Sequence, residues 1–244
     1  MREARKKKII KSIKKSDGKQ SATELGATIV KMAFELVPGG GAIAELIDYG
    51  MAEMKEKRLR EFMAQVKIDL EDLRVTLNED YVKTADFAFL LEHILRGVSQ
   101  NYQKEKLGAY RALLVNSLIR INVESDRKEY FLNILNSITS IHIIFLRVLD
   151  HPTKWAREKR IEFKQPATGN GPTPMTNLKL VLPKYEDTQI RAVMGDLYYD
   201  GLIDLVPNEF SSVMGPDLEG ITNRLSPLGK SFVDFIVIET KPAS

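Results

Sequence analysis

Residues 59–77 read LREFMAQVKIDLEDLRVTL, with apolar side chains at intervals of three and four residues and charged side chains between them. This spacing predicts an amphipathic helix that has one continuous apolar stripe. The stripe is formed by Leu59, Phe62, Val66, Leu70, Leu73 and Leu77. Because an apolar heptad stripe has to be covered, we expect it either to form one arm of a long helical hairpin or to mediate self-association of the chain.

Upstream of this helix, residues 35–46 read ELVPGGGAIAEL and separate it from an earlier apolar pattern of helical spacing. The proline and three glycines predict a corner between two packed helices, formed by Pro38, Gly39, Gly40 and Gly41. A phosphate-binding loop is not expected, because no Lys-Ser or Lys-Thr pair follows the glycines and no strand precedes them. A membrane-inserting hairpin is the alternative, although Lys31, Glu35 and Glu45 would then have to enter lipid.

The N-terminal end is strongly basic. Residues 1–20 carry nine Lys or Arg and two acidic residues, a net charge of +7, whereas the whole chain has a formal net charge of +3. We interpret this tail as a flexible, solubilising arm, and two alternatives stay open: a short basic helix on anionic lipid, or a nonspecific contact with nucleic acid. The candidate anion-binding residues are Arg2, Arg5, Lys6, Lys7, Lys8, Lys11, Lys14 and Lys15.

Downstream of the stripe, three further apolar patterns of helical spacing lie at about residues 80–97, 102–121 and 126–138. Together with the hairpin they predict a helical bundle over residues 21–138. Thr139 and Ser140 then precede an apolar run at residues 141–149. A hydroxyl at this point is typical of a helix N-cap, because it can accept a bond from a free amide of the first turn.

Residues 139–244 have the element order of a winged-helix module. A stretch rich in Pro and Gly, KQPATGNGPTPMTN at residues 164–177, predicts a long loop at residues 164–184. A helix at about 186–201, a short strand at 202–206 and a last helix after Ser226 and Pro227 follow. The fold class is therefore predicted to be mainly α, with an N-terminal helical bundle that contains a long helical hairpin, followed by a winged-helix-like C-terminal module.

The third helix of this module is acidic. Residues 184–201 carry Lys184 and Arg191 against four carboxylates, a net charge of −2. Winged helices usually insert this helix into the major groove, and an acidic helix is repelled by the phosphates of a duplex. We therefore expect the module to serve packing or protein contact.

Residues with obvious chemistry are few. The chain has no cysteine, and none of its three histidines, His93, His142 and His151, lies in a pattern with metal-ligand spacing. A single histidine on an apolar helix, such as His142, is typical of a core residue with satisfied hydrogen bonds. We predict a non-enzymatic protein with no cofactor, no metal and no catalytic residue. The absence of cysteine favours a cytoplasmic location, with peripheral attachment at the inner membrane face as the alternative.

Several stretches together resemble abortive-infection alpha-type proteins, which are helical bacterial phage-defence proteins. They are FELVPGGGAIAELIDYG, EKLGAYRALLVNSLI, FLNILNSITSIHIIFLRVLDH, GLIDL and RLSPLGKSFVDFI, in that order over residues 30–238. The resemblance implies a cytoplasmic protein that limits phage propagation through a protein or membrane target. The alternative function is a winged-helix transcriptional regulator whose C-terminal module and basic tail bind DNA.

Overall fold

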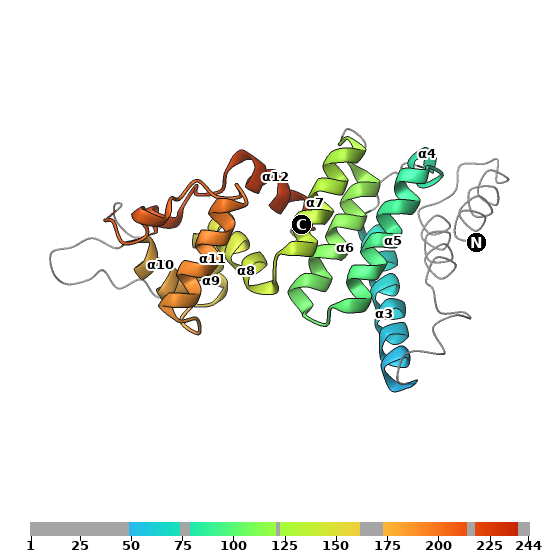
Figure 1. The fold of residues 1–244 in the computed structure, drawn as a ribbon, viewed down its shortest axis with the longest axis horizontal. Coiled ribbons are helices and arrows are strands. Elements are labelled where there is room, and N and C mark those ends of the chain that lie inside the picture. The colour runs from blue at the N-terminus through green and yellow to red at the C-terminus, as the bar shows by residue number, and fades with distance from the viewer. Residues whose placement is uncertain (1–48, 74–78, 121–122, 162–172, 214–217, 239–244) are drawn as a thin grey trace. The chain divides into compact units, whose positions relative to one another are not determined.

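The computed structural model describes residues 49–73, 79–120, 123–161, 173–213 and 218–238, and it is mainly helical, as the sequence predicts (Figure 1). Ten α-helices and two 3-10 helices lie in these ranges. No β-strand lies within them; one isolated antiparallel bridge joins Ile203 and Leu225. The basic tail and the predicted corner at residues 38–41 lie outside the described residues.

The chain divides into two compact units. Unit 1 contains the described residues up to Ser137 together with those from Phe235, and unit 2 contains Ile138–Asp234. The helices of unit 1 are α3 Tyr49–Leu73, α4 Glu79–Val82, α5 Ala85–Gln100, α6 Lys104–Ile119 and α7 Ser125–Ser137. Helices α3 and α7 each pack against both α5 and α6, and Figure 1 shows these four helices side by side.

The predicted apolar stripe lies on α3 and is covered from within unit 1. Leu59, Phe62, Val66 and Leu70 are all buried, and α5 and α6 are the helices packed against α3. Leu77 lies outside the described residues. These four side chains are therefore not a free surface that a second copy of the chain would have to cover.

The pattern at residues 80–97 forms two helices instead of the single one expected. Thr84 has extended backbone angles, and its Oγ1 accepts a hydrogen bond from the backbone N–H of Phe87 at 3.1 Å. The hydroxyl thus caps α5 and interrupts the helical backbone after Val82, which is the usual effect of Thr at such a position.

The last described residues belong to unit 1, whereas the sequence assigned them to the C-terminal module. The Nδ2 group of Asn116 on α6 donates to the carbonyl oxygens of Phe235 and Val237, at 2.9 and 3.1 Å. The ring of Phe235 also contacts that of Phe131 on α7, with 5.4 Å between centroids. These long-range contacts tie the end of the described chain to the first bundle.

Unit 2 contains α8 Ser140–Asp150, α9 Pro152–Glu158, α10 Pro174–Val181, α11 Asp187–Tyr199, η1 Pro207–Glu209, η2 Glu219–Ile221 and α12 Pro227–Ile236, whose last two residues belong to unit 1. Helix α11 packs against α8 and α10. Buried apolar side chains on these three helices form much of the core of unit 2, and they include Phe145, Leu178 and Met194.

Two predictions for unit 2 are wrong. The expected loop at residues 164–184 contains α10, because Pro174 occupies the first helical position and Thr173 Oγ1 accepts from the N–H of Thr176 at 3.2 Å. The expected strand at 202–206 is reduced to the single bridge of Ile203. The N-cap prediction for Ser226 is confirmed, since its Oγ accepts from the N–H of Gly229 at 2.9 Å.

Among the described residues, no single helix combines the length and the apolar composition needed to cross a membrane. The bent pair of α7 and α8 reaches that combination only when the two helices are counted together. Many of their apolar side chains, including Phe131, Leu135 and Leu146, are buried inside the protein.

Gly229→Ala is expected to destabilise unit 2. A Cβ atom at Gly229 would clash with the backbone carbonyl of Leu202, which cannot rotate away as a side chain would. Overpacking of this kind costs about 1–3 kcal/mol of unfolding free energy, measurable by urea denaturation. Gly195→Ala in α11 is the matched control, because nothing lies within 4 Å of its Cβ position, and it should add about 0.5–1 kcal/mol of stability. Equal effects of the two substitutions would contradict the close approach.

Candidate functional site

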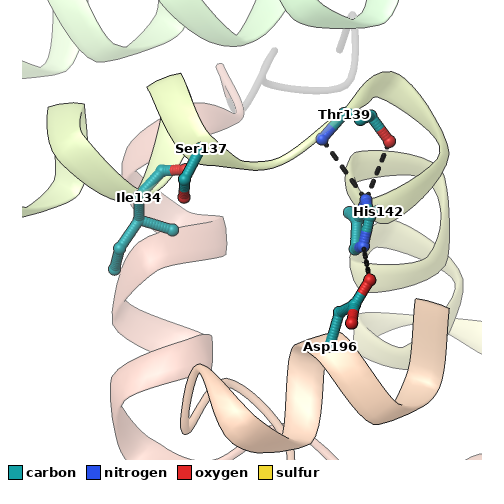
Figure 2. A network of polar contacts seen from close by, with 5 residues as sticks. All are labelled: Ile134, Ser137, Thr139, His142 and Asp196. Carbon is teal, nitrogen blue, oxygen red and sulfur yellow. Dashed lines mark hydrogen bonds and ion pairs between the residues drawn. The ribbon is translucent and has the colours of Figure 1, made fainter. Parts of the chain in front are cut away.

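His142 is a buried titratable residue in unit 2 that is bonded on both sides of its ring (Figure 2). It lies on α8, three residues after Thr139, the residue that precedes the helix. Its Nδ1 accepts from the backbone N–H of Thr139 at 3.3 Å and lies 2.8 Å from the Oγ1 of the same residue. Its Nε2 lies 3.2 Å from Oδ2 of Asp196, which projects from α11. Ser137 and Ile134 on α7 are also labelled in Figure 2; the Ser137 hydroxyl donates to the carbonyl oxygen of Ile134, with 2.8 Å between the two oxygens.

These contacts determine the tautomer of His142. A backbone N–H can only donate, so Nδ1 must carry a lone pair, and the Thr139 hydroxyl must donate to it as well. The ring proton is then on Nε2 and is donated to the Asp196 carboxylate. This assignment follows from the hydrogen-bond partners, as protons are placed in proteins generally.

Thr139, His142 and Asp196 place a hydroxyl, an imidazole and a carboxylate in the same order as a nucleophilic catalytic triad. A general base in such a triad takes the hydroxyl proton onto its free nitrogen. Here the backbone N–H of Thr139 donates to the same nitrogen, and a proton on Nδ1 would face that N–H. Moreover, the Asp196 side chain is 65% exposed, so water competes for its charge. The arrangement is better suited to cap α8 and tie it to α11 than to activate a hydroxyl.

Two lysines in unit 1, Lys106 and Lys128, are also buried. The Nζ of Lys106 donates to the carbonyl oxygen of Asn136 at 3.2 Å, and that of Lys128 donates to the carbonyl oxygen of Ser117 at 3.3 Å. Burial lowers the pKa of both lysines. A lysine with a lowered pKa is a candidate catalytic amine, but each Nζ here is directed at a backbone carbonyl, and Lys128 also lies 3.7 Å from the ring centroid of Tyr81. A structural role in the core therefore explains the burial of both lysines.

Burial also acts on two phenols of unit 1. It raises the pKa of Tyr110 to about 12, and burial together with the charge of Asp86 raises the pKa of Tyr81 to about 12. The hydroxyl of Tyr110 donates to Oδ1 of Asn136 at 2.7 Å. Tyr110 is thus a hydrogen-bonded part of the core that resists ionisation.

A basic segment at the junction of α8 and α9 was missed by the sequence analysis. Five Lys or Arg against Asp150 and Glu158 make a net charge of +3 between residues 147 and 160. The five basic residues are all exposed, and we call them the basic strip: Arg147, Lys154, Arg157, Lys159 and Arg160. The sequence contained a signal, since WAREKR is dense in charge. The net charge of the residues after the tail did not reveal this signal, because acidic segments elsewhere offset the positive charge of the strip.

The predicted functional residues are not brought together in the described part of the chain. The tail and the corner lie outside it, and α11 exposes carboxylates such as Asp187 and Asp196 beside Arg191. Within the described ranges, no three His, Asp or Glu side chains converge in a way that could hold a metal ion.

Comparisons of the chain with protein-family models, curated proteins and solved structures find no match.

His142→Ala is expected to lower the unfolding free energy more than Asp196→Ala does. The first substitution removes a buried ring that satisfies the cap of α8, and loss of a cap alone costs about 1 kcal/mol. The second removes a largely exposed carboxylate, whose contact is worth about 0–1 kcal/mol. Urea denaturation of both single variants and the double variant measures each term and their coupling. An Asp196→Ala effect as large as that of His142→Ala would show that the α8–α11 tie outweighs the cap.

Tyr110→Phe is expected to reduce the loss of stability at alkaline pH. The folded pKa is raised above the unfolded value, so between about pH 10 and pH 12 the folded protein holds a proton that the unfolded chain releases. Stability therefore falls as pH rises through this window, and Phe removes that contribution. Urea denaturation at several pH values above 9 checks the slope. Tyr102→Phe, at a residue that is 76% exposed, is the control, and an equal change in both variants would contradict the assignment to Tyr110.

Proposed function

We propose that this protein is a non-enzymatic helical effector of the abortive-infection alpha type, which acts in the cytoplasm by binding a macromolecular target. The observation that carries this proposal is how the buried polar groups are used. His142, Lys106 and Lys128 all direct their nitrogen atoms at protein partners. What the described units present to solvent is charge and a few apolar side chains, which are the features of a binding protein.

Unit 2 supports a winged-helix-like module as the binding unit. The helices α8, α10 and α11 precede a pair of segments joined by the Ile203–Leu225 bridge, and α12 follows. Two backbone bonds flank this bridge, from Asp204 N–H to the carbonyl oxygen of Arg224 at 2.9 Å and from Ser226 N–H to that of Leu202 at 3.0 Å. This pairing supports the proposal that the two segments correspond to the strands of a wing.

Within that module, α11 is suited to a protein partner. The helix in this position usually reads DNA, but here its region carries a net charge of −2 and its exposed residues include Asp187, Asp196 and Asp200. Tyr199, at the last turn, is 81% exposed. An exposed aromatic ring beside carboxylates favours contact with a basic protein surface over contact with phosphate.

A winged-helix transcriptional regulator is the second candidate function. The basic tail, with a net charge of +7, and the wing-like pairing in unit 2 favour it, whereas the charge of α11 opposes sequence readout by that helix. Membrane action at the inner face remains the third route, through the same tail.

The decisive experiment is phage infection of bacteria that express the full chain. The defence proposal predicts that expression reduces plaque formation at least tenfold for some members of a phage panel, and that infected cells stop growing. A chain lacking residues 1–20, compared at equal expression, tests whether the tail is needed.

Two biochemical measurements separate the alternatives. Sequence-specific, salt-sensitive binding to duplex DNA, with no effect on any phage, would replace the defence proposal by the regulator. Sedimentation with anionic vesicles that depends on residues 1–20 would assign the target to the membrane, and its absence would leave a protein target.

A further inference from the structure

We propose that the basic strip of unit 2 is a sequence-independent binding surface for the phosphate backbone of nucleic acid. The strip consists of the exposed residues Arg147, Lys154, Arg157, Lys159 and Arg160 around the junction of α8 and α9. The inference does not rest on the defence proposal, because it concerns a different surface from α11.

Among the described residues, the cations of the strip have no carboxylate partner, whereas three cations of α3 do. On α3, Lys57 and Lys67 lie 3.9 and 3.8 Å from the carboxylates of Glu61 and Glu71, one helical turn away, and Arg60 is paired in the same way. Among the described residues, no carboxylate oxygen lies within 4.0 Å of a basic nitrogen of the strip. Three cations of α3 are thus neutralised locally, whereas no carboxylate in the described part of the chain neutralises a cation of the strip.

The described carboxylates nearest in sequence do not change this; Glu162, two residues after Arg160, lies outside the described residues. Asp150 is bound by Lys230, with 2.8 Å between Nζ and Oδ1, and by His151, with 3.4 Å between Nε2 and Oδ2. Glu158 is exposed among the cations and is a single negative charge against five positive ones. The strip therefore keeps a local excess of positive charge.

The ordinary role of basic residues at helix ends explains only part of the strip. Arg147 and Arg157 lie in the last turns of α8 and α9, where a cation interacts favourably with the helix dipole. Lys154 lies in the middle of α9, and Arg160 lies beyond its end, so the dipole does not account for them.

Arg160 adds an independent observation. Its φ is +54°, in the left-handed region that favours glycine, and it follows α9 where the N–H of Ile161 bonds back to the carbonyl oxygen of Ala156 at 2.9 Å. At the end of α11, the equivalent left-handed residue is Gly201, with φ of +70°. An arginine at a position where glycine fits better suggests that the cation itself is needed.

The composition of the strip favours nucleic acid over a lipid surface. A helix that lies on a membrane inserts an apolar face between the headgroups. The large apolar side chains that are exposed in the described residues all lie outside residues 147–160: Met54, Ile68, Tyr102, Tyr130, Leu180, Tyr199 and Val213. Trp155 is half-buried, donates from Nε1 to the carbonyl oxygen of Val181 at 3.4 Å, and lies under Lys159. Without a free ring to stack on bases, the strip can contact phosphates but cannot read sequence.

The test is the salt dependence of binding of the full chain to labelled DNA duplexes of about 20 base pairs and two unrelated sequences, between about 50 and 200 mM salt. The variant Lys154→Glu/Arg157→Glu is expected to bind both duplexes at least about tenfold more weakly at low salt. Each lost phosphate contact removes about 0.9 from the slope of log affinity against log salt, so the slope should fall by about 2. Arg160→Gly should lower the slope by about 1 without lowering the melting temperature.

The matched control is Lys104→Glu/Lys184→Glu, which makes the same change in net charge at two exposed lysines outside the strip. It should leave the slope within experimental error of the original chain. Circular dichroism melting of each variant checks folding. A small fall in melting temperature is expected for the strip variant, because Arg157→Glu places a carboxylate in the last turn of α9, where it opposes the helix dipole.

Three results would overturn the proposal. The first is an equal fall in slope for the strip variant and its control, which would show a general charge effect. The second is duplex binding that disappears on removal of residues 1–20 and does not respond to changes in the strip. The third is a strip-dependent interaction with phosphatidylserine vesicles but not with duplexes.

Discussion

The apolar stripe of α3, packed against α5 and α6, is the contact on which unit 1 depends. Burying a Leu, Val or Phe side chain contributes on the order of 1.5–3 kcal/mol, and Leu59, Phe62, Val66 and Leu70 are all buried. The ion pair beside them contributes more to the alignment of the two helices than to the free energy of unfolding. Arg111 on α6 lies 2.7 Å from Oδ2 of Asp69 on α3, yet burial raises the pKa of that carboxyl despite the arginine. Such a pair helps to set the register of two helices that apolar packing holds together.

Several buried polar groups in both units form hydrogen bonds that hold parts of the fold together. Asn116 holds the end of the described chain, Lys106 and Tyr110 share Asn136, and His142 caps one helix while it contacts another. Because these atoms already have protein partners, chemistry at any of them would first have to break a native contact. The surface charges have no such restriction. Three cations of α3 are paired with carboxylates, whereas the cations around the junction of α8 and α9 have no carboxylate partner within the described residues, and this difference favours the second region as a binding surface.

Local features of the chain were predicted well, and features that depend on folding were not. The helices near residues 102–121 and 126–138 and the cap at Ser226 follow from spacing and from a hydroxyl close to a free amide. The helix α10 was missed because its Pro and Thr residues were interpreted as loop signals, although Pro at the first helical position and Thr before it also begin helices. The same residue types are typical of both structures, and only packing of the following apolar residues decides between them.

The sequence by itself determined that this protein is mainly helical, where most of its described helices lie, and that its charge is unevenly distributed, because each of these properties depends on residues a few positions apart. Only the tertiary structure decided which helices cover the α3 stripe, that His142 meets Asp196 across 54 positions of the chain, and which cations have no carboxylate partner among the described residues. These outcomes depend on contacts between distant segments, and the pattern of a single helix contains no information about which surface will face it.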